Sequence, residues 1–202
     1  MDFLASGEKH TWLFYNEISN NSLTLHALAE KDVDIVLIVV DPNGTALVLQ
    51  NEAPAGQIET ITDLAMTRDG DYKIIIYAVN EAEGDYGLMA QDSASFPKIL
   101  FNIIGYNRPT ATSFNENTEQ IWFFTGNDRD TITITADPDD NSDIDFEFFG
   151  PGNEFLDFVA DGLTGETEVL ADYTLGVSGL FGFWLFGEAP GTITANLTIT
   201  TN

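Results

Sequence analysis

Polar and apolar residues alternate along several stretches of this chain. In residues 22–27, 131–136 and 192–200, a polar residue, most often threonine, fills every second position and an aliphatic residue fills the others. An alternation with a period of two is typical of an antiparallel strand that buries one face. Two largely apolar runs, 35–40 and 73–79, are rich in β-branched residues and indicate strands in the middle of a sheet.

Turn signals separate these predicted strands at short intervals. Glycine, proline, asparagine and aspartate gather at residues 41–44, 69–71, 83–85, 126–128 and 150–152. The one helix-like stretch, 27–31, is too short to be stable alone. Many short strands joined by regular turns predict an all-β protein built as antiparallel β-sandwiches.

The chain also repeats itself. Residues 11–14 (TWLF) return as 121–124 (IWFF), and residues 32–35 (DVDI) return as 143–146 (DIDF). A repeat that holds several strands per copy predicts two tandem domains, which we place at 1–92 and 93–202. We expect features present in both copies to be scaffold and features present in one copy to carry function.

The two copies differ at their beginnings. A strand-like segment, 98–104, precedes the shared part of the second copy, whereas the first copy has only eleven residues ahead of Trp12. The first copy is therefore predicted to lack its first strand. Two explanations stay open: a boundary within a longer protein, or a sheet edge that accepts a strand from another chain. Residues 1–4 lack the basic and apolar regions of a signal peptide, which favours a mature or excised fragment.

Charge narrows the range of partners. The chain has 33 acidic and 7 basic residues, a net charge of −26, spread over both copies (16 acids and 4 bases in 1–92, 17 and 3 in 93–202). Nucleic acid needs clusters of lysine and arginine, so it is not expected as a partner. The chain has no cysteine and no apolar run long enough for a membrane-spanning helix, so neither disulfides nor membrane insertion are expected. The acidity fits solubility in a salty or extracellular medium, and it also fits binding of divalent cations.

The order of the motifs resembles the bacterial pre-peptidase C-terminal domain. In that family a Trp-x-Phe strand, an alternating strand, an Asp-x-Asp segment, a Pro-Asn-Gly-type turn and two Gly-x-Tyr strands follow one another. The first copy carries nearly all of these motifs, at Trp12 and Phe14, Asp32 and Asp34, 41–44, 70–74 and 84–88. The second copy departs at both Gly-x-Tyr strands, where 179–181 reads GLF and 191–193 reads GTI. The resemblance implies jelly-roll-like accessory domains of secreted and cell-surface proteins, without catalysis. Some relatives, among them the collagen-binding modules of bacterial collagenases, bind calcium.

Calcium is the cofactor that the acidic residues suggest. Oxygen-bearing side chains occupy every second position at Asp137, Asp139, Asn141 and Asp143, a spacing that can surround a hard cation. The segment is not an EF-hand, and residues 27–31 take its place in the first copy. Two repeated pairs, Asp32 with Asp34 and Asp143 with Asp145, would set carboxylates side by side if they lay in strands. Each pair either holds calcium or fixes a neighbouring loop by hydrogen bonds, and the segment 137–143 is either a calcium site or a solvated acidic turn.

Aromatic residues concentrate in the second copy. Residues 181–186 (FGFWLF) make both faces of a strand apolar, so one face is expected to contact the first copy, a partner protein or a sugar ring. The candidate binding residues are Phe181, Phe183, Trp184 and Phe186.

The sequence offers little for catalysis. Its two histidines, His10 and His26, both lie in the first copy, and paired carboxylates alone do not make a hydrolase cleft. We therefore predict a non-catalytic structural or adhesive module, stabilised by calcium, at the cell surface or outside the cell. Its partners would be a protein or a polysaccharide. The alternatives are a self-assembling fibre or surface-layer subunit that exchanges strands between chains, and a carbohydrate- or protein-binding module.

Overall fold

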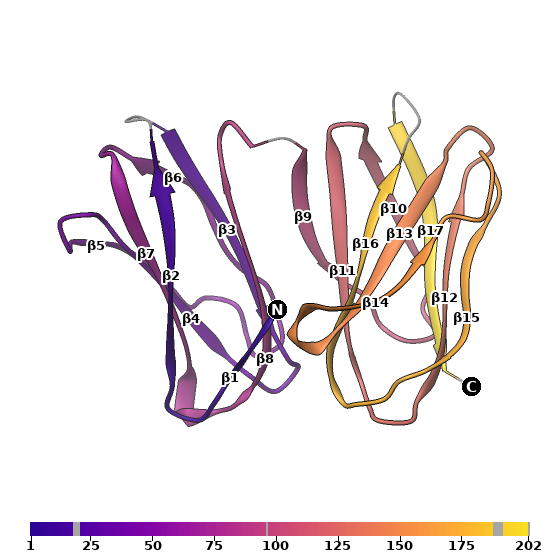
Figure 1. The fold of residues 1–202 in the computed structure, drawn as a ribbon, viewed down its shortest axis with the longest axis horizontal. Helices are drawn as coiled ribbons and strands as arrows, with labels where there is room; N and C mark the ends of the chain where they lie inside the picture. The colour runs from indigo at the N-terminus through magenta and orange to yellow at the C-terminus, as the bar shows by residue number, and fades with distance from the viewer. Residues whose placement is uncertain (18–20, 96, 188–191, 202) are drawn as a thin grey trace. The chain divides into compact units, whose positions relative to one another are not determined.

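The computed structural model describes residues 1–17, 21–95, 97–187 and 192–201. The chain divides into two compact units, Met1–Ser95 and Phe96–Asn202, a division just beyond the predicted seam. Figure 1 shows that both are built from strands. In the described part of the chain the helical segments are two single turns, η1 (Val79–Glu81) and η2 (Pro151–Asn153).

The first unit is a sandwich of two four-stranded antiparallel sheets. One sheet has the order β1-β8-β3-β6 and the other β2-β7-β4-β5. The strands are β1 (Asp2–Leu4), β2 (Lys9–Asn16), β3 (Asn21–Ala29), β4 (Ile35–Val40), β5 (Ala46–Gln50), β6 (Glu59–Met66), β7 (Gly70–Ala78) and β8 (Gly84–Asp92). The helix-like stretch 27–31 is not a helix, because β3 continues to Ala29 and a turn follows.

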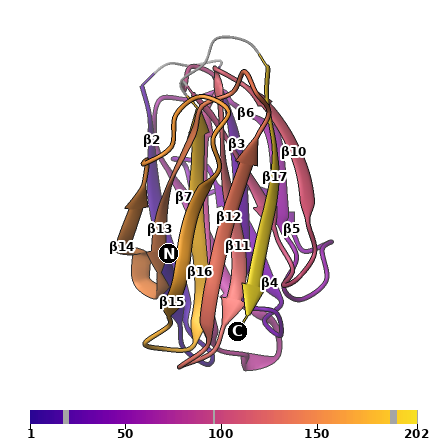
Figure 2. The same cartoon turned by 90° about the vertical axis from the view of Figure 1, so that its right-hand side faces the viewer.

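The second unit repeats this arrangement with one strand more. Its sheets have the orders β10-β17-β12-β15, which lie side by side in Figure 2, and β14-β13-β16-β11-β9. The strands are β9 (Lys98–Ile103), β10 (Thr110–Asn115), β11 (Thr118–Gly126), β12 (Thr131–Pro138), β13 (Ile144–Gly150), β14 (Glu154–Val159), β15 (Glu168–Thr174), β16 (Gly179–Gly187) and β17 (Thr192–Thr201). Strands β10 to β17 follow the order of β1 to β8, so each unit contains an eight-stranded jelly roll, to which β9 is added in the second, and the predicted fold class is confirmed.

Strand pairing fixes which residues of the two units are equivalent. Phe146 pairs with Leu185 as Leu37 pairs with Ile76, so β13 and β16 correspond to β4 and β7 in register. On the other side of β16 and β7, Trp122 pairs with Phe183 as Trp12 pairs with Ile74, so β11 corresponds to β2.

The repeated Asp-x-Asp motif is out of register by two positions. The structure aligns Asp143 with Asp34, and not with Asp32, because Ile35 and Ile144 begin equivalent strands. Turn contacts agree: the amide of Gly56 bonds the carbonyl of Val33 as that of Gly165 bonds Ser142. Both glycines have positive φ, and an added Cβ would meet the backbone of residue 31 or 140, so the two turns need glycine.

Each unit has its own core, made of the side chains that alternate inward. The first core is mostly aliphatic, with Leu25, Leu37 and Ile76 fully buried. The second is aromatic, and Phe124, Phe148 and Phe181 lie stacked, with ring centroids 5.6–6.2 Å apart. Within the described residues no helix has the length and apolar character needed to cross a lipid bilayer.

Candidate functional site

Strand β2 is the open edge of its sheet. It is hydrogen-bonded to β7 on one side and, among the described residues, to no strand on the other. Large side chains face solvent there, with exposed fractions of 43% for Trp12, 65% for Leu13 and 62% for Tyr15. An uncharged run of aromatic and aliphatic residues is unusual on an exposed edge, where charges or proline normally prevent pairing with other chains.

The equivalent strand of the second unit is covered. Strand β9 pairs in parallel with β11, from Lys98 opposite Thr118 to Ile103 opposite Phe123. The ring of Phe101 packs edge-on against Phe123 with centroids 4.8 Å apart. Trp122 and Phe123, the equivalents of Trp12 and Leu13, have exposed fractions of only 5% and 2%. Among the described residues no strand equivalent to β9 lies beside β2.

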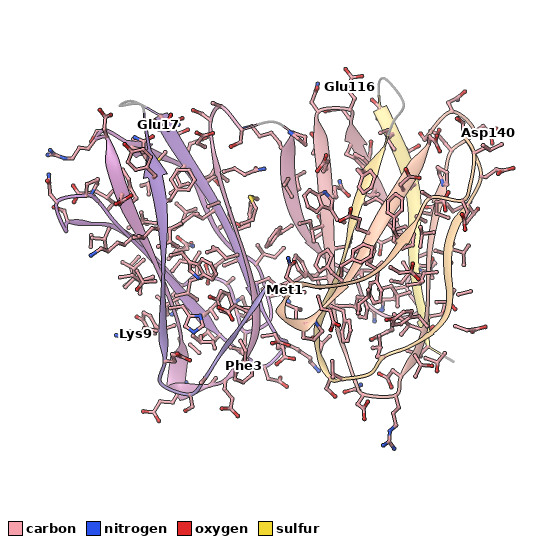
Figure 3. All side chains as sticks on the ribbon, in the orientation of Figure 1. Met1, Phe3, Lys9, Glu17, Glu116 and Asp140 are labelled. Carbon is pink, nitrogen blue, oxygen red and sulfur yellow. The ribbon has the colours of Figure 1, made fainter. Side chains whose placement is uncertain are left out.

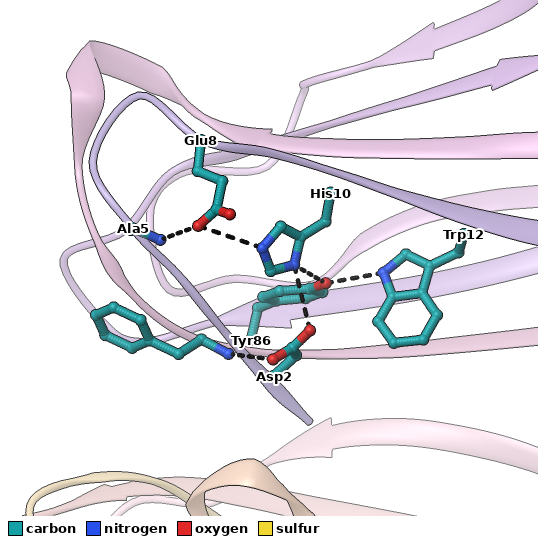
Figure 4. A network of polar contacts seen from close by, with 7 residues as sticks. Asp2, Ala5, Glu8, His10, Trp12 and Tyr86 are labelled. Carbon is teal, nitrogen blue, oxygen red and sulfur yellow. Dashed lines mark hydrogen bonds and ion pairs between the residues drawn. The ribbon is translucent and has the colours of Figure 1, made fainter.

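A polar cluster lies behind the open edge (Figure 4). Nε1 of Trp12 donates to the hydroxyl of Tyr86 on β8 across 2.8 Å, and Nδ1 of His10 is 2.8 Å from the same oxygen. Two carboxylates flank the imidazole: Asp2 Oδ2 is 3.3 Å from Nδ1, and Glu8 Oε2 is 3.4 Å from Nε2. Glu8 also accepts from the backbone N–H of Ala5, which holds the loop before β2.

The chemistry of this cluster is that of a hydrogen-bond anchor. Burial raises the pKa of the Tyr86 hydroxyl to about 12, so it is a neutral donor and acceptor and no base. Because the hydroxyl accepts from Trp12, it can donate its own proton to a neutral His10, whose Nε2–H then points to Glu8. The adjoining cavity, lined by Met1, Asp2, Trp12, Tyr86 and Leu88, holds about 70 Å³, far below the ~300–1,000 Å³ of small-molecule sites.

In the second unit a neutral side chain accepts the hydrogen bond of the equivalent tryptophan. Gln120, the equivalent of His10, accepts from Nε1 of Trp122 at 2.9 Å and from the hydroxyl of Thr112 at 2.7 Å. Thr112 stands where Asp2 stands in the first unit, and both glutamine and tryptophan are buried. The tryptophan and its hydrogen-bond acceptor are thus scaffold, whereas the histidine and its two carboxylates are particular to the first unit.

The acidic segment 137–143 forms a hydrogen-bonded turn. Asp139 accepts from the amide of Asn141 and from the hydroxyls of Ser142 and Thr194, and these contacts lower the pKa of its carboxyl. Asp137 accepts from the hydroxyl of Thr167 at 2.6 Å. Asp140, which projects from the turn, is labelled in Figure 3. Among the described residues no three acidic or histidine side chains lie close enough to hold a metal ion. Calcium binding by this segment stays a prediction.

The other predicted metal ligands are dispersed. Asp32 is exposed and Asp34 half-buried, and both lie in the connection before β4, not in a strand. Asp143 likewise precedes β13, and only Asp145 lies within it. The expected side-by-side carboxylates on a strand face are therefore absent for the first pair. One oxygen of Asp34, Oδ1, is buried without a hydrogen-bond partner.

The aromatic run is divided between two faces of β16. Phe181 and Phe183 point into the core and are fully buried, so the prediction that they bind a ligand is wrong. Trp184 and Phe186 point to the outer face and are half-buried. Nε1 of Trp184 donates to Glu119 at 2.8 Å, and Phe186 stacks on the half-exposed Phe158 with centroids 6.2 Å apart.

Two buried glutamates escaped the sequence analysis. Glu59 and Glu168 occupy equivalent positions at the starts of β6 and β15. Glu168 accepts from the amides of Asp161 and Gly162, and Glu59 accepts from the amide of Ala53. Each carboxylate therefore ties down the loop that precedes its strand. Their recurrence at the same place in both units is a signal that a register-correct alignment of the two copies would have found.

A shallow polar groove also crosses the outer face of β10, β17 and β12. It encloses about 390 Å³ and is lined by Ala111, Thr112, Ser113, Asp137, Pro138, Asp139, Thr194, Ala195 and Asn196. Its two carboxylates, Asp137 and Asp139, accept hydrogen bonds from the hydroxyls of Thr167 and Thr194.

Comparison with known proteins adds little. No protein-family model and no curated protein matches the chain. One solved structure that matches is PliG of Aeromonas hydrophila, described as a periplasmic lysozyme inhibitor of g-type lysozyme. The match has 16% identity and a TM-score of 0.38, and it covers 52% of this chain and 98% of that one. A likeness this distant carries no argument about what this chain does.

Proposed function

We propose that this chain is a non-catalytic binding module that holds another polypeptide at the open edge of β2. We further propose that it serves as a structural or adhesive accessory of a secreted or cell-surface protein. The observation that carries the proposal is the contrast between two equivalent strands: β11 is covered by β9, whereas β2 exposes Trp12, Leu13 and Tyr15.

An exposed sheet edge binds extended peptides through its own backbone. The backbone N–H of Lys98, at the start of β9, donates to the carbonyl of Asn117, and that of Ile104, just after the end of β9, donates to the carbonyl of Phe123. The odd-numbered residues of β11 therefore turn their backbone groups toward β9. The equivalent residues Lys9, Thr11 and Leu13 therefore direct their N–H and C=O groups to the open edge. Main-chain hydrogen bonds supply affinity in such complexes, and the side chains beside the edge supply specificity.

Several features argue against catalysis. His10 and Trp12 both bond the hydroxyl of Tyr86, and no serine, threonine or cysteine side chain takes part in these contacts. The cavity beside them is too small for a substrate of ordinary size. Asp139 and Glu168 use their oxygens to hold loops. The net charge of −26 and the resemblance to pre-peptidase C-terminal domains support an accessory module outside the cell.

Peptide binding with an edge-blocking variant tests this function. Short peptides with alternating apolar residues are titrated into the isotope-labelled chain, and we expect amide signals of Lys9 to Tyr15 to shift. Thr11→Pro removes an edge-facing N–H without disturbing the β2–β7 ladder, so it should fold and lose peptide binding. Leu49→Lys, on the opposite edge strand of the same sheet, is the control and should bind as the wild type does. Peptides that leave β2 unperturbed, or bind Thr11→Pro equally well, refute the proposal.

The outer aromatic face of the second unit supports a second candidate function, binding of a polysaccharide. Trp184, Phe186 and Phe158 lie on one face of the sheet, with Glu119 and Glu147 beside them. Aromatic rings next to carboxylates suit the apolar face and hydroxyls of a sugar. Retention on an immobilised polysaccharide that Phe158→Ala abolishes, while Phe3→Ala on the first unit preserves it, would favour this function. Equal retention of both variants would exclude it.

A further inference from the structure

We propose that the strand accepted by β2 runs parallel to it, carries the side-chain pattern of β9, and is not the β9 of a second copy. This inference rests on the proposed function and specifies its ligand.

The direction and register follow from the second unit. Strand β9 runs parallel to β11, with Phe101 opposite Ile121 and Ile103 opposite Phe123. Transferred from β11 to β2, the same geometry sets the third-last residue of the incoming strand opposite Thr11 and the last opposite Leu13. Strands β2 and β11 pair identically with β7 and β16, so the edges offer the same pattern of backbone groups.

The side chains of β2 define the chemistry of that strand. On the outer face, Leu13 takes the place of Phe123, against which Phe101 packs, so an aromatic or β-branched residue is required there. The first residue of the strand, equivalent to Lys98, falls opposite Glu8. Asp2 and Glu8 add negative charge at this end, which makes a lysine or arginine favourable at the first position. The ligand is therefore a basic residue followed by alternating large apolar residues.

A second copy of this chain is a poor source of the strand. Each chain has two equivalent edges that suit a strand like β9, those of β2 and β11, and in the described residues one such strand, β9, which already covers β11. Moving β9 to the β2 edge of a neighbour uncovers Phe123 and Trp122 in the chain that donates it. Exchange of β9 among identical chains therefore leaves the same number of β2 and β11 edges uncovered as before. Two chains of net charge −26 also repel each other, so the occupant is a strand with the pattern of β9 but not the β9 of a second copy.

The experiment uses a peptide with the sequence of residues 98–104 and the full chain. We expect saturable binding with amide shifts at Lys9 to Tyr15 and none at β11. A nitroxide on the amino end of the peptide should broaden signals near Glu8, and one on the carboxyl end should broaden signals near Tyr15. Replacing the phenylalanine of the peptide by aspartate, or its lysine by glutamate, should weaken binding by about tenfold or more.

Each alternative outcome has a distinct meaning. Reversed broadening shows an antiparallel ligand and overturns this inference while the proposed function stands. If other peptides bind at β2 and this one does not, the proposed side-chain pattern of the ligand is wrong, and the proposed function stands. Shifts at Trp122 and Phe123 show replacement of β9 and overturn the inference. Concentration-dependent dimers that Thr11→Pro abolishes identify a second copy as the occupant and also overturn it. Failure of every peptide removes the proposed function itself.

Discussion

The indole nitrogen of Trp12 on β2 lies 2.8 Å from the hydroxyl of Tyr86 on β8, and this hydrogen bond links the two sheets of the first unit at the open edge, beside the contact of His10 with the same hydroxyl. In the second unit Gln120 takes the role of that hydroxyl and satisfies Trp122 and Thr112. The two donors differ in their access to water, because Trp12 is partly exposed and Trp122 is buried.

We therefore expect removal of the two acceptors to lower the free energy of unfolding by different amounts. Tyr86→Phe should lower the free energy of unfolding of the first unit by about 1 kcal/mol, since water can replace the lost hydroxyl at the exposed Trp12. Gln120→Leu should cost the second unit about 2–3 kcal/mol, because the N–H of Trp122 is left buried without an acceptor. Urea unfolding followed by amide signals assigned to each unit measures both. A Tyr86→Phe cost equal to or above that of Gln120→Leu contradicts this account.

The buried glutamates supply a second matched pair of variants. In Glu168→Gln the new amide group meets one of two backbone N–H donors, from Asp161 and Gly162, so we expect a loss of about 2 kcal/mol. In Glu59→Gln the amide group can take the position of Oε2, which has no partner, and the loss should be below about 1 kcal/mol. Equal melting temperatures for the two variants would show that the loop contacts do not differ as the distances indicate.

The fold was predictable because its strands bury one face and expose the other. The threonine-rich alternation of 131–136 becomes β12, whose isoleucines are buried and whose threonines are half-buried. The apolar run 35–40 becomes β4, a strand with neighbours on both sides. Period and turn chemistry are local properties, so sequence alone carries them.

The alignment of the two copies could not be predicted from matching residues in the sequence. The two Asp-x-Asp motifs match in letters, yet Asp34 aligns with Asp143 because strand spacing, and not residue identity, is what the two units share. The roles of Glu168 and Asp139 depend on backbone amides and hydroxyls from other segments, which no local pattern reveals. The alternation in 181–186 separates the residues into two faces, but only packing decides that Phe183 points inward and Trp184 outward.

A variant of Asp139 distinguishes a hydrogen-bonded turn from a calcium site. Its carboxylate accepts from Ser142, Thr194 and the amide of Asn141, so Asp139→Ala should lower the melting temperature of the second unit. We expect the same loss in EDTA and in excess calcium, because protein donors already occupy the oxygens. Asp140→Ala, at the exposed tip of the same turn, is the control and should have little effect. A rise in melting temperature on adding calcium that Asp139→Ala abolishes would instead establish the cation site predicted from the spacing.

His26 should make the first unit less stable in mild acid. The imidazole lies on β3 with Nδ1 3.1 Å from the hydroxyl of Thr60, and burial lowers its pKa below the ordinary value of 6.5. The unfolded chain therefore binds a proton at a higher pH than the folded chain does. Stability from this group is fully present above the unfolded pKa of about 6.5 and is lost as pH falls through the folded pKa.

The matched variant is His26→Gln, which keeps a polar group near Thr60 and cannot become protonated in this range. Unfolding free energies measured in urea from neutral to mildly acidic pH should fall more steeply for the wild type than for the variant. Glu30 and Glu119, whose pKa values burial raises, contribute with the opposite sign to both proteins and cancel in the difference. Parallel pH curves for the two proteins would show that His26 protonates equally in the folded and unfolded states.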